Sequence, residues 1–101
     1  MARGYWITFY RTITNAGALA EYAKLAGPAI EAGGGKILAR GVPAKAYEAG
    51  LKERTVLIEF ENLAKAIATY EGADYQIAAK LLVGAVEREV RMVEGTREGT
   101  V

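Results

Sequence analysis

The chain has 101 residues, which is enough for one domain with a single and rather thin hydrophobic core. Its 13 basic residues nearly balance its 12 acidic ones, so we expect no nucleic-acid partner. The absence of cysteine and histidine excludes disulfides, thiolate metal sites and the side chain that most often carries protons near neutral pH. We therefore expect neither a metal ion nor a cofactor.

The apolar residues are spread along the chain rather than gathered in one long run. No stretch approaches the roughly 20 consecutive apolar residues that a bilayer crossing needs. The amino end has no apolar segment of secretory type after Arg3. We expect no membrane partner and a cytoplasmic location.

The first predicted element is a central strand at Tyr5–Tyr10. Its alternate residues form two sets, Tyr5/Ile7/Phe9 and Trp6/Thr8/Tyr10, and both sets are largely apolar. A strand that is apolar on both faces is usually covered on both sides.

A helix follows, capped by Asn15 or by Thr14. One apolar face is formed by Leu19, Tyr22, Ala23, Ala26 and Ile30. Proline removes a backbone donor, so Gly27-Pro28 predicts a kink or a short break. The run Gly33–Gly35 ends the helix. A phosphate-binding loop is not expected there, because such a loop follows a strand and opens a helix.

The second strand is predicted at Lys36–Arg40 and the third at Thr55–Phe60. The connection between them, Gly41–Glu53, is long for a hairpin, so we read it as an extended loop. A short extra strand pair near Ala44–Tyr47 is an alternative.

The second half of the chain repeats the strand–helix–strand plan. Asn62 caps a helix that Gly72 stops, and Asp74 caps a further helical piece. The last strand runs from about Arg88 to Val93. We expect one domain over residues 1–95 and a flexible tail over residues 96–101.

The order β-α-β-β-α-β predicts an α+β, ferredoxin-like fold with a four-stranded antiparallel sheet. Right-handed crossovers place the first and third strands at its centre and the helices on one face. The helix-facing sets are expected to be Tyr5/Ile7/Phe9, Ile37/Ala39, Val56/Ile58/Phe60 and Val90/Met92. The opposite, open face would carry Trp6, Thr8, Tyr10, Leu38, Arg40, Leu57, Glu59, Arg91 and Val93. On a lone protomer Trp6, Tyr10, Leu57 and Val93 would form an apolar patch. Such a patch usually marks an interface or a ligand site, and we expect a homodimer.

At these residues the chain resembles the bacterial "domain of unknown function 1330" family of the dimeric α/β-barrel superfamily. The matching pieces are Gly4-Tyr5-Trp6-Ile7, Tyr22 with Pro28, Gly34-Gly35, Arg40-Gly41, Glu48 with Gly50, Arg54, Val56 with Ile58-Glu59-Phe60, Tyr70, Tyr75-Gln76 and Val93-Glu94-Gly95. The departures are Ala73-Asp74, where the family more often has Pro-Glu, and Leu51-Lys52-Glu53, which replaces a more usual aromatic. The resemblance implies a homodimer whose two sheets form a barrel. It implies no settled activity, and relatives in the superfamily include cofactor-free monooxygenases, lactone isomerases and haem-handling proteins.

Glu59 is the candidate catalytic residue, because a carboxylate in an apolar strand can act as a general base. The alternative is a structural ion pair with Arg40 or Arg91. Arg40 and Arg54 are candidates for holding a carboxylate by bidentate hydrogen bonds, or else they balance nearby glutamates.

The candidate ligand-binding residues are Trp6, Tyr10, Arg40, Arg54, Tyr70 and Tyr75. The aromatic members are also suited to a purely structural role in packing or at an interface.

Two functions remain open. The first is a homodimeric protein that binds a small molecule in a cleft on the open face. The second is a cofactor-independent enzyme, monooxygenase-like or isomerase-like, that acts on a small carboxylated or aromatic compound with Glu59 as acid/base.

Overall fold

The computed structural model describes residues 2–96, so most of the predicted tail, residues 97–101, lies outside the described residues. The elements are β1 (Gly4–Ile13), α1 (Ala16–Ala32), β2 (Lys36–Gly41), β3 (Thr55–Phe60), α2 (Leu63–Glu71), α3 (Ala73–Ala79), a 3₁₀ turn η1 (Lys80–Leu82) and β4 (Val86–Glu94). Within residues 2–96, no helix has the length and apolar character that a bilayer crossing requires.

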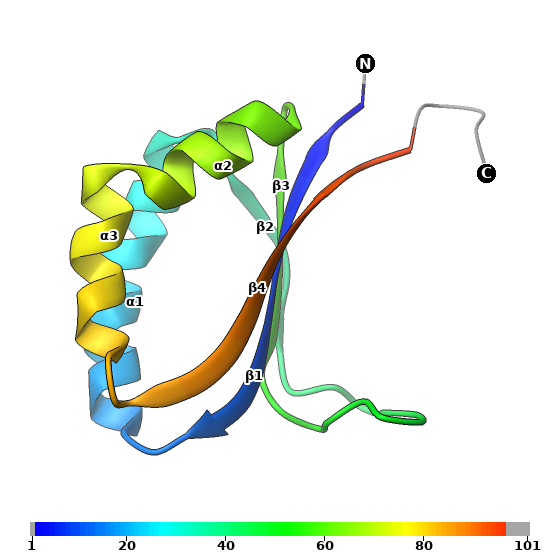
Figure 1. Ribbon diagram of the computed structural model, residues 1–101, viewed down its shortest axis with the longest axis vertical. Helices are drawn as coiled ribbons and strands as arrows, with labels where there is room; N and C mark the ends of the chain where they lie inside the picture. The colour runs from blue at the N-terminus through cyan, green and yellow to red at the C-terminus, as the bar shows by residue number, and fades with distance from the viewer. Residues whose placement is uncertain (1, 97–101) are drawn as a thin grey trace.

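The four strands form one antiparallel sheet in the order β2-β3-β1-β4. All helices cover the same face of this sheet (Figure 1). The ferredoxin-like α+β fold with β1 and β3 at the centre is therefore confirmed. The connection between β2 and β3 is the extended loop that was expected, without the extra strand pair that was the alternative near Ala44–Tyr47. It extends away from the helices (Figure 1).

The helix caps are mostly as predicted. The side chains of Asn15 and Asn62 each accept a hydrogen bond from a backbone N–H in the first turn of α1 and α2. Asp74 is not a cap, because Gly72 occupies that position and Asp74 lies in the first turn of α3.

Of the kink or short break expected at Gly27-Pro28, the break is wrong, because α1 continues through Pro28. The proline ring normally clashes with the Cβ of the residue before it, and this clash disfavours the helical conformation. Gly27 has no Cβ, so the pair can stay helical. The buried face made by Tyr22, Ala26 and Ile30 then runs along the helix without interruption.

The two faces of β1 are the reverse of the prediction. Trp6, Thr8 and Tyr10 are buried beneath the helices. The open face instead carries Tyr5, Ile7 and Phe9 from β1, Thr55, Leu57 and Glu59 from β3, and Glu89, Arg91 and Val93 from β4. The core beneath the helices is built around Trp6, with Ile58, Phe60, Ala66, Tyr75 and Ala78 among the buried residues.

Gly4 explains why β1 takes this orientation. A Cβ built on Gly4 would lie 2.5 Å from the backbone N and Cα of Leu63 at the start of α2. The residues at positions 4, 6, 8 and 10 share one face of a strand. The side of β1 that α2 approaches most closely is therefore the side that carries Gly4 and Trp6.

We expect Gly4→Ala to lower the free energy of unfolding by about 1–3 kcal/mol, the usual cost of overpacking. The added methyl group meets backbone atoms, which cannot move aside as a flexible side chain would. Urea denaturation followed by circular dichroism measures the effect. Gly17→Ala is the matched control, because only the side chain of Asn15 lies near its added Cβ, at 3.4 Å, and alanine favours the helix. Equal stability of the two variants would contradict the close approach of α2.

Candidate functional site

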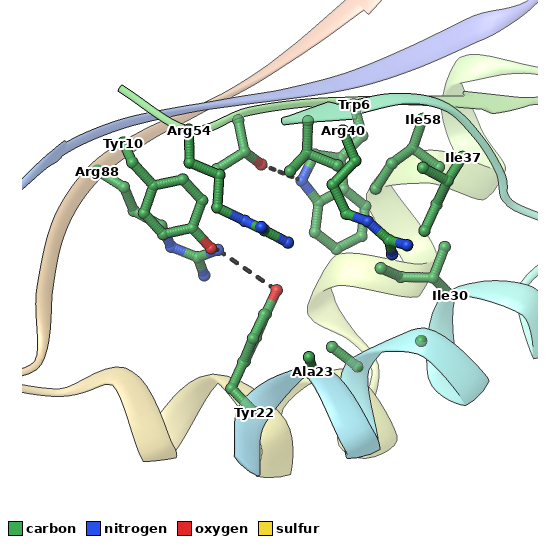
Figure 2. A pocket seen from close by; sticks show the side chains of 14 residues that line it. Trp6, Tyr10, Tyr22, Ala23, Ile30, Ile37, Arg40, Arg54, Ile58 and Arg88 are labelled. Atoms are coloured by element: carbon green, nitrogen blue, oxygen red, sulfur yellow. Dashed lines mark hydrogen bonds between the residues drawn. The ribbon is translucent and has the colours of Figure 1, made fainter. Parts of the chain in front are cut away.

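A cavity of about 50 Å³ lies between α1 and the helix-facing side of the sheet (Figure 2). Its lining comprises Trp6, Thr8, Tyr10, Tyr22, Ala23, Ala26, Gly27, Ile30, Ile37, Arg40, Arg54, Val56, Ile58 and Arg88. We call this space the α1 cavity. It has room for several water-sized groups, so it suits a small molecule.

Arg40 reaches the α1 cavity because β2 contains a bulge. The pairing of β2 with β3 shifts by one residue between Ile37 and Ala39. A bulge adds one residue to a strand and so reverses the faces of the residues beyond it. Arg40 is therefore opposite Val56 and on the same face as Ile37, rather than on the open face where alternation placed it.

Arg54 enters the cavity from the end of the β2–β3 connection. Its backbone carbonyl accepts a hydrogen bond of 2.9 Å from the Tyr10 N–H, which fixes this residue against β1. Its guanidinium carbon lies 6.0 Å from the centre of the Tyr10 ring, at the limit of a cation–π contact. The Nε atom of Arg54 is buried and has no hydrogen-bond partner among the described residues. A buried unpaired donor is costly, so this group is suited to an acceptor on a ligand.

Arg88 binds a group of three tyrosine hydroxyls. Its guanidinium donates hydrogen bonds to the hydroxyl oxygens of Tyr75 at 2.9 Å and of Tyr10 and Tyr22 at 3.4 Å. The hydroxyls of Tyr22 and Tyr75 are themselves 2.6 Å apart. Arg88 only donates, so it occupies acceptor positions on these hydroxyls and leaves the proton of Tyr10 free for another partner. Tyr10 and Tyr22 also line the cavity.

The protonation states make this end of the cavity positive. Burial raises the pKa of Tyr10, and burial together with the Tyr22 phenol raises the pKa of Tyr75 far above the usual tyrosine range. Burial alone would lower the pKa of Arg88, but the phenols of Tyr75 and Tyr22 raise it overall. At neutral pH the phenols of Tyr10 and Tyr75 are therefore neutral and the guanidinium of Arg88 is charged.

No carboxylate lines the cavity within residues 2–96. The salt bridges among those residues use Arg11, Lys24, Lys65 and Arg91 as their cations. The charges of Arg40, Arg54 and Arg88 thus meet no protein anion in the described chain. Three guanidiniums around one small cavity give it the chemistry of an anion site.

The structure brings together four of the six predicted ligand-binding residues. Trp6, Tyr10, Arg40 and Arg54 all line the α1 cavity, although it lies on the helix-facing side of the sheet and not on the open face. The prediction placed these residues on the wrong face of the sheet, but they do lie together around one cavity.

Tyr70 and Tyr75 do not line the cavity. They pack edge-on against the Trp6 ring at centroid distances of 5.2 and 4.6 Å. The hydroxyl of Tyr75 also accepts a hydrogen bond from Arg88, so Tyr75 helps to position Arg88 without lining the cavity itself. Whether any of the six predicted residues binds a ligand remains a prediction.

Glu59 lies apart from this group, on the open face. Its carboxylate accepts a hydrogen bond of 3.1 Å from the Tyr5 hydroxyl, and this bond raises the pKa of Tyr5. Neither predicted ion pair is formed, because Arg91 binds Glu89 and Arg40 is on the other face. Glu59 stays a predicted acid/base, but within one protomer it cannot act on a molecule that Arg40 holds.

Sequence reasoning missed Arg88 and Tyr22 as members of the site. Arg88 alternates with Val90 and Met92, which were predicted to face the helices, so the same alternation places Arg88 beside them. Tyr22 was correctly predicted to be buried, but its hydroxyl depends on partners from β4 and α3 that no local pattern reveals.

Solved structures of other proteins superpose on nearly the whole of this chain and so support its fold. A protein of unknown function from Rhodopseudomonas palustris is 17% identical, with a TM-score of 0.73 over 95% of this chain and 84% of that chain. A dimeric ferredoxin-like protein of unknown function from Bacteroides fragilis is 17% identical, with a TM-score of 0.54 over 91% of this chain and 95% of that one.

A third structure, a dimeric ferredoxin-like protein of unknown function from Thermobifida fusca, is 13% identical, with a TM-score of 0.52 over 91% of this chain and 90% of that one. A search of curated proteins found no significant match. The family model "Domain of unknown function (DUF1330)" matches residues 3–96, nearly the whole chain. The chain therefore belongs to the DUF1330 family.

Proposed function

We propose that this protein is a homodimeric binding protein for a small carboxylate, which it holds in the α1 cavity of each protomer. The observation that carries the proposal is the set of three guanidiniums, Arg40, Arg54 and Arg88, around a small cavity whose described lining contains no carboxylate. A bound carboxylate would supply the missing negative charge.

The surrounding donors suit this ligand. A guanidinium offers two parallel N–H groups that match the two oxygens of a carboxylate. Arg54 has a buried Nε–H without a partner among residues 2–96, and it lies beside the Tyr10 ring. Trp6 and Ile58 supply an apolar wall for the rest of the ligand.

A second copy of the chain is the proposed partner of the open face. Two of the structural relatives are described as dimeric. The centre of the open face is apolar, with Ile7 opposite Leu57. Beside it, the β2–β3 connection extends on the side away from the helices (Figure 1) and exposes Val42, Tyr47 and Leu51. An exposed apolar surface of this kind is typical of an interface.

The test of carboxylate binding is calorimetric titration with sodium propionate at fixed ionic strength. We expect saturable binding, and we expect Arg54→Gln to weaken it about 10–100-fold, because a hydrogen bond to a charged group contributes about 1.5–3 kcal/mol. Arg11→Gln is the control, since Arg11 pairs with Glu87 and Glu89 and does not line the cavity. Absence of binding in the wild type, or equal binding by Arg54→Gln, would refute the proposal.

A further inference from the structure

The positive groups of the α1 cavity are divided between its two ends. In Figure 2, Arg88 lies with Tyr10 at one end, and Arg40 lies with Ile37 at the other. The guanidinium of Arg54 lies between them. The site therefore has one more deeply buried cationic end, where the half-buried Arg88 donates to the buried Tyr10 and Tyr22, and one exposed cationic end at Arg40.

The wall between these ends is largely apolar. The indole of Trp6 occupies it, and its Nε1–H already donates to the Thr8 hydroxyl at 2.9 Å, so the ring offers only its apolar surface. Val56 from β3, opposite Thr8, also lines the cavity, and Ile58 lies with Ile37 at the Arg40 end (Figure 2). Such a surface accommodates a short hydrocarbon spacer and offers it no polar partner.

The number of positive charges also favours a ligand with more than one negative group. A single carboxylate brings one negative charge to a cavity lined by three guanidiniums, so two positive charges would stay uncompensated in the described part of the chain. Like charges that share a cavity repel one another, and the repulsion is stronger where water is partly excluded. A ligand with two separate negative groups offsets more of this repulsion than a ligand with one.

On the basis of the proposed carboxylate binding, we propose that the natural ligand class is a short aliphatic dicarboxylate. One carboxylate binds Arg88, Arg54 and the phenols of Tyr10 and Tyr22 in the buried end. The spacer lies along Trp6, and the second carboxylate binds Arg40 at the exposed end. Arg40 is then the residue that distinguishes dicarboxylates from monocarboxylates.

The experiment compares sodium propionate, sodium succinate and inorganic phosphate by calorimetric titration at pH 7.5 and fixed ionic strength. We expect succinate to bind about 10-fold more tightly than propionate, because Arg40 is exposed and a charge-assisted bond at such a site contributes only about 1.4 kcal/mol. Arg40→Gln should abolish this advantage, because it should weaken succinate binding about 10-fold more than it weakens propionate binding. Phosphate, a compact anion, should bind more weakly than succinate because it cannot reach both ends.

Lys36→Gln is the matched control, because Lys36 is an exposed cation on the same strand that does not line the cavity. It should keep the preference for succinate. If propionate binds but succinate has no advantage, or if Arg40→Gln weakens both acids equally, the dicarboxylate inference is wrong and the proposed function stands. Phosphate binding tighter than succinate would also overturn the inference. If neither acid binds, both proposals fail.

Discussion

Replacing Trp6 with alanine is expected to lower the free energy of unfolding by about 3–5 kcal/mol, the usual cost of truncating a buried large aromatic side chain. Trp6 is 1% exposed, and its ring contacts those of Phe60, Tyr70 and Tyr75. The truncation also leaves the buried Thr8 hydroxyl without its 2.9 Å donor. A domain of this size is typically stable by about 5–15 kcal/mol, so much of the stability would be lost.

Urea denaturation followed by far-ultraviolet circular dichroism measures this loss, because Trp6 is the only tryptophan and its fluorescence disappears in the variant. Trp6→Phe keeps a ring in the core and should lose less, which gives a measurable value if the alanine variant is too unstable to study. Ile77→Ala is the control, since Ile77 is 58% exposed on α3, and it should change the stability by less than about 1 kcal/mol. A loss for Trp6→Ala as small as that of the control would mean that β1 turns its other face to the helices.

The order of elements could be predicted from the sequence because each boundary has a local cause. Asn15 and Asn62 cap helices through their own side chains, and Gly72 ends α2. The face of β1 could not be decided by alternation, because both of its residue sets are apolar. It depends on the approach of α2 to Gly4, a contact between segments about 60 residues apart.

The candidate site shows how two errors can preserve a correct grouping. Trp6 and Tyr10 were assigned to the wrong face because β1 was reversed, and Arg40 was assigned to that same face because the bulge in β2 was not foreseen. The three residues therefore stayed together in the prediction and are together in the structure. Glu59 was separated from them, since neither error affected β3.

Because Glu59 lies on the open face, it takes no part in the chemistry of the α1 cavity. Its described lining supplies guanidinium and phenol donors and no carboxylate that could remove a proton from a ligand. The arrangement favours recognition of an anion over general base catalysis, which needs a proton acceptor whose pKa lies near the operating pH. Any reaction that uses Glu59 would have to take place on the open face.

The proposed dimer gives the second large expected effect. Leu57→Lys should raise the dimer dissociation constant by at least about 1000-fold. Leu57 lies on the open face between Ile7 of β1 and Ala39 of β2, near the centre of the sheet. In a two-fold symmetric interface the substitution occurs on both protomers, so two like charges would be buried without a partner. A penalty of about 4 kcal/mol corresponds to this change in dissociation constant.

Sedimentation equilibrium over a range of protein concentrations measures the dissociation constant directly. Leu25→Lys is the matched control, because Leu25 is 47% exposed on α1, and α1 covers the face of the sheet opposite the open face (Figure 1). It carries the same change in charge and should leave the dimer intact. A wild-type protein that is monomeric, or a Leu57→Lys variant that remains as dimeric as the control, would show that the open face is not the surface through which two copies associate. Propionate binding by a folded Leu57→Lys monomer would further show that the α1 cavity is complete within one protomer, as its lining residues indicate.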